Sequence, residues 1–357
     1  MGLPQINIFF KKSAETAVKR SGEGVVALIL KDDTAVSADI GTSKSYSKLV
    51  EVDPKHYTDT NYDYITKTFM GSPKKVIVEI IGEGDSYDEA LARLKNKKWN
   101  YLAVPGIEES DSKTIADWVI SQRAAKKTFK AVLNYEANHI GIINFDTDGI
   151  VVGDDTYTAE QYCCRIAGLL AGLSFNDYER ASATYAQLTE VEAIEESADP
   201  DTDINNGKLI LINDGSVIKI GRAVNSITKL SDGQTEDMKK IRIIEIMDLI
   251  CDDIREAFAT NYLGVYANSY DYKLLFVNEV TQYLRRLADS DILESEHDNR
   301  AFIDVDTQRA WLSNKTDVSD LSDDEVKKAK TGSNVFVGAS IQPLDAMEDL
   351  EMHITNN

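Results

Sequence analysis

Apolar residues in the first 95 positions fall into short runs separated by turn-forming residues. Each run has the length of one strand rather than of a helix. Strands are expected at residues 24–30, 34–40 and 75–81. Ser86, with Glu89 three positions later, forms a capping pattern that predicts a helix to about Lys98. The pattern therefore predicts a small β-rich domain over residues 21–95.

The next stretch alternates between the two kinds of pattern. Strands are expected at residues 99–104, 129–135, 139–145, 208–212 and 217–224, and helices at residues 114–127 and 158–173. Strand–helix alternation is typical of α/β layer structures with a partly parallel sheet. We therefore expect an α/β middle domain over residues 96–230.

After residue 235 the spacing of apolar residues changes to three or four. It predicts one long amphipathic helix, with Glu236 and Asp237 in its first turn, and a second helix over residues 270–288 that pairs with it. Strands are expected at residues 301–305, 335–344 and 350–354. The sequence thus predicts a helical-plus-sheet C-terminal domain over residues 231–340.

The two ends of the chain form short amphipathic segments of opposite charge. Four basic residues against one Glu give residues 1–20 a charge of +3, and four acidic residues give residues 341–357 a charge of −4. The candidate N-terminal strand contains Leu3, Ile6, Ile8, Phe10, Lys11 and Lys12, and the candidate C-terminal strand contains Asp345, Met347, Glu348, Leu350, Met352 and Ile354. Such strands either complete the chain's own sheet or add to a sheet edge on another molecule.

Composition narrows the possible partners. The 357 residues carry 39 Lys and Arg against 60 Asp and Glu, a net charge of −21. This balance argues against nucleic acid and anionic membranes as main partners, because both require basic surfaces. No apolar stretch reaches the roughly 18 residues that a membrane-spanning helix needs, and the first 20 residues lack the pattern of a signal peptide. The three cysteines are too few for a disulfide framework, which favours synthesis in a reducing cytoplasm.

A search for chemistry finds no convincing motif. The four histidines have no zinc-site spacing, and no phosphate-binding P-loop is present. Gly82-Glu83-Gly84 lacks the third glycine of a dinucleotide loop, and the loop that starts at Asp146 lacks the Gly and Glu of a calcium loop. We therefore expect no cofactor, no metal and no catalytic residue. An alternative is a hydrolase whose Ser, His and Asp are distant in the sequence and come together only in the folded structure.

Several segments, in order, resemble a known family. They read AVNSITKL at residues 223–230, IMDLICDDIR at residues 246–255, YLG at residues 262–264, AN at residues 267–268 and PLDAME at residues 343–348. This series resembles the C-terminal domain of contractile tail sheath proteins. The opening GLPQINI at residues 2–8 is similar to the N-terminal arm of the short sheaths of Gram-positive phages and phage-tail-like bacteriocins.

The resemblance implies a structural subunit and not an enzyme. Such subunits stack as hexameric rings around an inner tail tube protein, and their arms add strands to neighbouring subunits. Contraction drives the tube through a cell envelope, with baseplate and tail terminator proteins as further partners. The resemblance implies a subtilisin-like α/β middle domain without a working triad, and N- and C-terminal arms at residues 1–20 and 341–357. The location implied is a phage or phage-tail-like particle made in a bacterial cytoplasm.

Three hypotheses follow from the resemblance and the charges. The basic N-terminal arm and the acidic tail pair as neighbouring strands. Lys239, Lys240 and Arg242 contact the tube, or alternatively form a solvated helix face. Deleting residues 1–15 leaves a monomer that cannot polymerise. A different tail tube or baseplate component remains an alternative function, although the long helices after residue 235 argue against a mostly β subunit.

Overall fold

The computed structural model describes residues 24–33, 39–173 and 181–355. They divide into two compact units, which we call unit 1 and unit 2. Unit 1 is Ile246–Leu344, and unit 2 is the described part of the chain before it together with the tail from Asp345 onward. In sequence, unit 1 is therefore inserted into unit 2.

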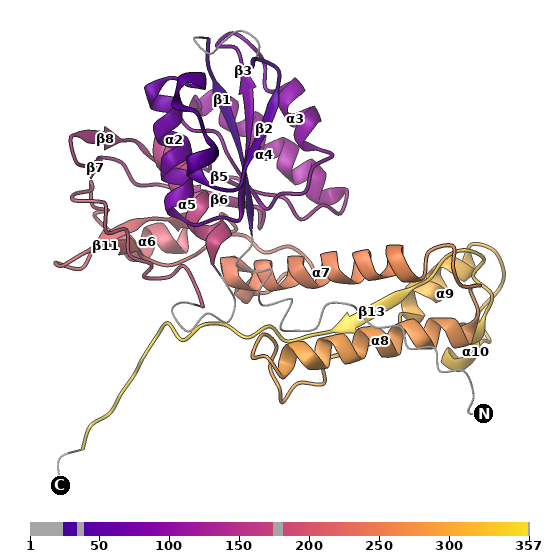
Figure 1. Ribbon diagram of the computed structural model, residues 1–357. Coiled ribbons are helices and arrows are strands. Elements are labelled where there is room, and N and C mark those ends of the chain that lie inside the picture. The colour runs from indigo at the N-terminus through magenta and orange to yellow at the C-terminus, as the bar shows by residue number, and fades with distance from the viewer. Residues whose placement is uncertain (1–23, 34–38, 174–180, 356–357) are drawn as a thin grey trace, which may run out of the picture. The chain divides into compact units, whose positions relative to one another are not determined.

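Unit 2 is built on one seven-stranded sheet (Figure 1). Its strands, in spatial order, are β2 (Ser43–Tyr46), β3 (Lys75–Ile81), β1 (Val25–Lys31), β4 (Tyr101–Ala103), β5 (Lys130–Leu133), β6 (Ile142–Phe145) and β9 (Lys208–Leu209). All neighbouring strands are parallel except β2, which runs antiparallel to β3. The chain is thus a mixed α/β fold with a parallel-rich sheet.

Helices cover both faces of this sheet (Figure 1). They are α2 (Asp59–Met70) and α5 (Ala159–Gly172) on one face and α3 (Asp88–Leu94) and α4 (Glu109–Ala124) on the other. The short α6 (Pro200–Asn205) precedes β9. Alternate residues of β1 enter different cores: Val26 and Leu28 pack in the core that includes α2 and α5, and Ala27 and Ile29 pack in the core that includes α3 and α4. Because both faces are buried, β1 is a continuous apolar run instead of an alternating one.

The contact between α2 and α5 depends on glycine. A Cβ atom on Gly168 would lie 2.1 Å from the carbonyl oxygen of Thr68, and one on Gly71 would meet the α5 backbone. Thr158 caps α5 together with Gln161, as the sequence predicts. Short elements complete unit 2: η1 (Leu49–Glu51), η2 (Pro54–His56), β7 (Ile150–Val152), β8 (Asp155–Tyr157), β10 (Leu211–Asn213), β11 (Ile218–Ile220) and η3 (Glu236–Lys239).

The sheet crosses the boundary that the sequence predicts near residue 95. Strands β1 and β3 belong to the expected small β-rich domain, yet β1 pairs in parallel with β4 of the expected middle domain. The prediction of a separate domain over residues 21–95 was therefore wrong. Parallel strands are joined by long crossovers, so their pairing leaves no local signal. Most of the expected strand at residues 34–40 lies outside the described residues.

Unit 1 contains most of the long helix α7 (Ile241–Asn261), which begins in unit 2. Its other elements are α8 (Tyr270–Ala288), β12 (Arg300–Ile303), α9 (Val305–Ser313), α10 (Asp323–Lys328) and β13 (Val337–Ser340). The ring centroids of Phe258 and Phe276 lie 5.3 Å apart, and the Tyr283 hydroxyl donates a 2.6 Å hydrogen bond to Asp253. These contacts confirm the predicted pairing of α7 and α8. Strands β12 and β13 form an antiparallel pair.

Candidate assembly site

The C-terminal tail, residues 345–355, forms no helix or strand in the described chain. The Leu344 N–H still donates to the Ile292 carbonyl in unit 1, at 2.9 Å. From Asp345 onward the described residues include no strand. The predicted strand at residues 350–354 is therefore wrong for the single chain, because no described strand lies beside it to exchange backbone hydrogen bonds.

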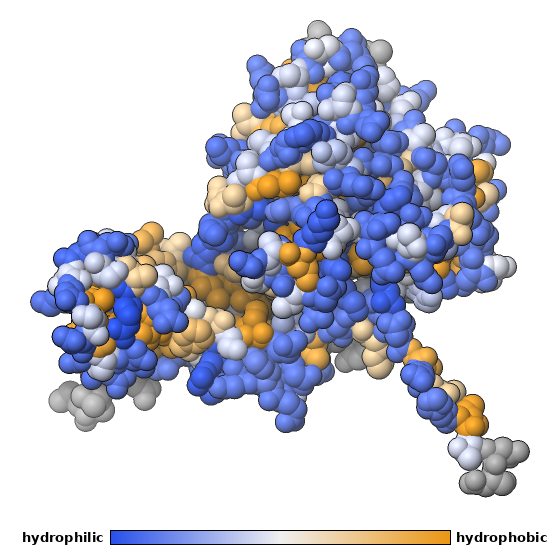
Figure 2. All heavy atoms as spheres, turned by 180° about the vertical axis from the view of Figure 1, so that it is seen from behind, coloured by the Kyte–Doolittle hydropathy of each residue, from blue (hydrophilic) through white to orange (hydrophobic). Residues whose placement is uncertain are grey.

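Apolar side chains of this tail are turned to solvent. Leu350 is 87% exposed and Ile354 is 82% exposed, and Met347 and Met352 are exposed as well. Figure 2 shows hydrophobic side chains on the tail where it stands away from the rest of unit 2. Burying such a side chain is worth about 1.5–3 kcal/mol. A contiguous set of exposed apolar side chains is typical of an interaction site.

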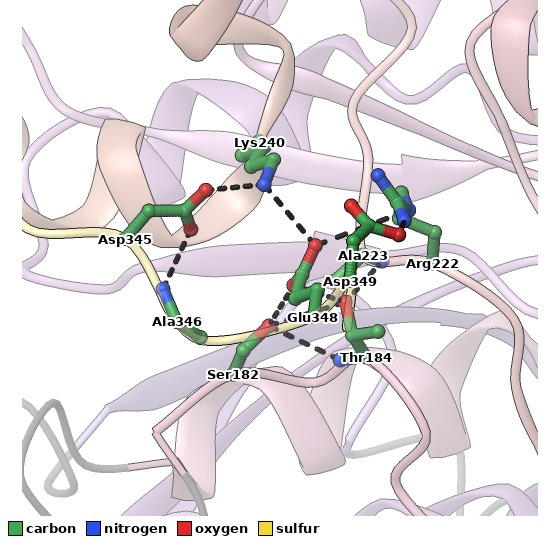
Figure 3. Close-up of polar contacts among 9 residues, drawn as sticks. All are labelled: Ser182, Thr184, Arg222, Ala223, Lys240, Asp345, Ala346, Glu348 and Asp349. Atoms are coloured by element: carbon green, nitrogen blue, oxygen red, sulfur yellow. Dashed lines mark hydrogen bonds and ion pairs between the residues drawn. The ribbon is translucent and has the colours of Figure 1, made fainter. Parts of the chain in front are cut away.

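The first five residues of the tail are fixed to unit 2 by charge (Figure 3). The Lys240 Nζ atom contacts the Asp345 carboxylate and lies 3.2 Å from Glu348 Oε2. Burial lowers the pKa of Lys240, but the hydrogen bond to Asp345 and the charges of Glu348 and Asp345 outweigh it and raise that pKa. The ammonium group is therefore kept charged between two carboxylates.

Glu348 and Asp349 extend this attachment. Glu348 Oε1 accepts hydrogen bonds from the hydroxyls of Thr184, at 2.6 Å, and Ser182, at 3.1 Å. The Glu348 side chain is only 5% exposed. Arg222 Nη2 donates to Asp349 Oδ1 at 2.5 Å, and this hydrogen bond raises the pKa of Arg222. Three acidic residues of the tail, Asp345, Glu348 and Asp349, thus bind the body of unit 2, whereas the apolar residues are exposed.

The structure separates the six predicted tail residues into two groups. Asp345 and Glu348 are attached to unit 2, whereas the apolar ones are exposed. Sequence reasoning missed Asp349 and the partners Arg222, Ser182 and Thr184. The only available signal was the three closely spaced carboxylates, and such a run usually marks a solvated surface.

The predicted tube contact, Lys239, Lys240 and Arg242, does not form one free basic cluster. Lys239 pairs with Glu236 at 2.6 Å, and Lys240 binds the tail. Arg242 is buried, and its Nη1 donates to the Ala181 carbonyl at 2.7 Å. Burial lowers the pKa of Arg242, against the raising effect of Asp345 and Glu348. A role for these residues in tube contact stays a prediction.

The predicted N-terminal strand lies outside the described residues. This applies to Leu3, Ile6, Ile8, Phe10, Lys11 and Lys12. The complementary pairing of this arm with the tail therefore also stays a prediction.

Candidate catalytic groups do not converge in the described part of the chain. His297 contacts the Ser340 hydroxyl and His56 contacts the Asp39 carboxylate, but no described histidine contacts both kinds of group. Cys164 is buried in α5, and burial raises its pKa to about 12. Among the described residues, no three or more His, Cys, Asp or Glu gather as a metal site would require. None of the described helices is long and apolar enough to cross a membrane.

Comparison with protein families gives two matches. Residues 82–226 match the central domain of phage tail sheath proteins. Residues 233–356 match the C-terminal domain of phage tail sheath proteins. The two matches follow one another along the chain and leave the first 81 residues outside.

Individual proteins and structures agree with these matches. A tail sheath protein of Clostridium phage phiCD119 is 35% identical to this chain, over 99% of both sequences. The fold is similar to that of a sheath tail protein of Listeria innocua, with a TM-score of 0.72, 15% identity, and coverage of 94% of this chain and 96% of the other. It is also similar to the helical sheath of the anti-feeding prophage in its contracted state, with a TM-score of 0.69, 14% identity and full coverage of both chains.

Proposed function

Because this chain belongs to the family of phage tail sheath proteins and is a structural subunit of a contractile tail sheath, we propose that its C-terminal tail links neighbouring subunits. The family is structural and non-enzymatic, and its place is the sheath of a phage tail or phage-like particle. The subunit assembles with copies of itself and with other tail components. The observation that carries the proposal is the exposed, unpaired apolar segment at residues 350–354.

The segment has the composition of a strand to be donated. Leu350, Met352 and Ile354 alternate with polar residues, so one face of an extended chain would be apolar. In a neighbour's sheet, each backbone hydrogen bond would add about 1 kcal/mol. Three buried side chains, at about 1.5–3 kcal/mol each, would add more. Together these contributions support a joint that survives mechanical load.

The acceptor we propose is the β12–β13 sheet in unit 1 of a neighbouring copy. Within the described residues this sheet has two strands, so each of them has one edge with no described strand beside it. On the outer edge of β12, the Ala301 N–H donates to Thr281 Oγ1 of α8, at 3.1 Å. On β13, the outer edge has no strand beside it among the described residues, and we propose this edge as the acceptor.

The wider assembly is proposed from the resemblance to sheaths. Stacked hexameric rings surround an inner tube, baseplate and terminator proteins close the ends, and contraction drives the tube through an envelope. The N-terminal arm, with its charge of +3, lies beside the tail in the shared sheet, where Glu351 is the acidic residue of the donated segment. The α/β layer is of the subtilisin type without a working triad, which the parallel sheet covered by helices on both faces supports.

Truncation of the tail tests this function. Removing residues 350–357 leaves the charged attachment in place, so the chain should fold with unchanged thermal stability but form no tubes in negative-stain images. Removing only residues 355–357 is the matched control and should leave tube formation intact. Replacing Leu350, Met352 and Ile354 together by Ser should reproduce the loss in a chain of full length. Normal tubes from the 350–357 truncation would contradict the proposal.

A further inference from the structure

Within the described residues the chain passes between the two units twice, and both of these passages are fixed on unit 2. The first lies at Glu245, in α7, and the second lies at Asp345, at the start of the tail. Each passage is fixed by contacts that lie wholly within unit 2. The elements of unit 1 follow the first passage, and the donated segment follows the second.

The first passage is anchored by a buried lysine. Lys130 of β5 is buried, and its Nζ lies 3.0 Å from Glu245 Oε1. The Tyr101 hydroxyl of β4 donates to the same carboxylate. Just before this point, the Ile241 N–H donates to the Ala223 carbonyl at 3.1 Å. The start of α7 is therefore joined to the central sheet.

The second passage is anchored to the first. Lys240 immediately precedes α7, and its ammonium group contacts both Asp345 and Glu348. Arg222 binds Asp349, and Thr184 and Ser182 hold Glu348 (Figure 3). We call this set of contacts, made by Asp345, Glu348 and Asp349 with Lys240, Arg222, Ser182 and Thr184, the tail clip.

We propose that the tail clip makes the C-terminal arm mechanically part of unit 2, so that only residues 350–357 pass to the neighbouring subunit. This inference rests on the proposed strand donation, and it specifies the residue at which the donated arm begins. The arm swivels at Leu350 and not at residue 341, where the sequence predicts its beginning. A pulling force on a docked arm therefore acts on the start of α7 and on the sheet of unit 2, and it is not transmitted through unit 1.

The tail clip is ionic, so its contacts should weaken as the salt concentration rises. Three carboxylates and two cations share it, and added salt screens such contacts when they are partly open to solvent. Asp349 and Arg222 are the more exposed pair, whereas the Glu348 side chain is buried. High salt should therefore loosen Asp349 before it releases Glu348.

Spin labels on the full-length, unassembled chain test the clip. With Cys251→Ser as background, one label replaces Met347, inside the clip, and another replaces Met352, beyond it. Both side chains are exposed, so the labels should not disturb packing. In 0.1 M salt the label at position 347 should have a rotational correlation time about threefold longer, or more, than the label at position 352. Equal mobility at the two positions would overturn the proposal.

Substitutions in the tail identify the contacts responsible. The triple variant Asp345→Asn, Glu348→Gln and Asp349→Asn leaves the body of unit 2 unchanged, and it should make the label at position 347 as mobile as the one at 352. Glu351→Gln removes a charge from the same tail outside the clip, and it should change nothing. If the label at position 347 stays restricted in its motion in the triple variant, charge does not hold the tail and the proposal fails.

Assembled tubes separate this inference from strand donation. Donation predicts that the label at position 352 becomes restricted when tubes form, whereas the clip predicts that the label at position 347 is restricted both before and after assembly. A label at 352 that stays mobile in tubes would contradict donation while leaving the clip intact. A label at 347 that is mobile before assembly would contradict the clip while leaving donation intact.

Discussion

Strand β1 and the tail are both extended segments rich in apolar residues, and they differ in what surrounds them. Residues 25–31 have β3 on one side and β4 on the other, and their five central side chains are buried. Residues 350–354 have no described strand beside them, and their apolar side chains are exposed. The two segments therefore differ in whether a neighbouring strand is present and not in strand propensity. The subunit completes its sheet in unit 2 from its own strands, and we propose that a neighbouring subunit supplies the partner strands of the tail.

Truncating one leucine in each segment gives the largest expected contrast. Leu28 is fully buried in β1, so Leu28→Ala should lower the free energy of unfolding by about 2–5 kcal/mol. Leu350→Ala should change it by less than about 0.5 kcal/mol, as surface substitutions do. Chemical denaturation of the unassembled chain measures both. A cost at Leu350 close to that at Leu28 would mean that the tail is buried within its own subunit.

A second, smaller contrast concerns two histidines. The Nδ1 atom of His139, beside β6, accepts a hydrogen bond from the Gly141 N–H at 3.0 Å, which protonation would remove. Burial, and then the charge of Arg123, lower the pKa of His139 to about 4. His353 in the tail is exposed, and it serves as the comparison.

The sign of the pH effect follows from the lowered pKa. Below the ordinary histidine pKa of about 6.5 the unfolded chain binds a proton that the folded chain resists, so stability should fall as the pH drops from 6.5 toward 4. His139→Gln should flatten this dependence by on the order of 1–3 kcal/mol relative to the unsubstituted chain. His353→Gln should leave the curve unchanged. Identical curves for His139→Gln and the unsubstituted chain would show that His139 is not held neutral.

Much of the fold is predictable from local pattern, and the exceptions have physical reasons. The apolar runs of β1 and β3 and the periodicity of α7 and α8 were read correctly, because each signal is local. Helix α2 was missed, since its buried residues include Asn61, Lys67 and Thr68. Its buried face is therefore partly polar, and a hydrophobic pattern does not detect it. The parallel pairing of β1 with β4 depends on distant residues and left no trace in either strand.

The candidate site divides in the same way. The alternation of Leu350, Met352 and Ile354 is visible in the sequence. It predicts a strand in the tail but does not specify which sheet that strand joins. The contact between Lys240 and Asp345 joins residues 105 positions apart. Nothing in the composition of either segment specifies that pairing, because exposed charges find partners only after the fold has placed them. The attachment of the tail therefore required the structure.

The most direct test of the account is a cryo-EM map of the assembled sheath in which residues 345–355 are traced. We predict that residues 345–349 remain on Lys240 and Arg222 of their own chain. We also predict that residues 350–354 form a strand beside β13 of a neighbouring copy. A tail that folds back on its own subunit, or that joins no neighbouring sheet, would contradict the central claim that the tail is completed by its neighbour.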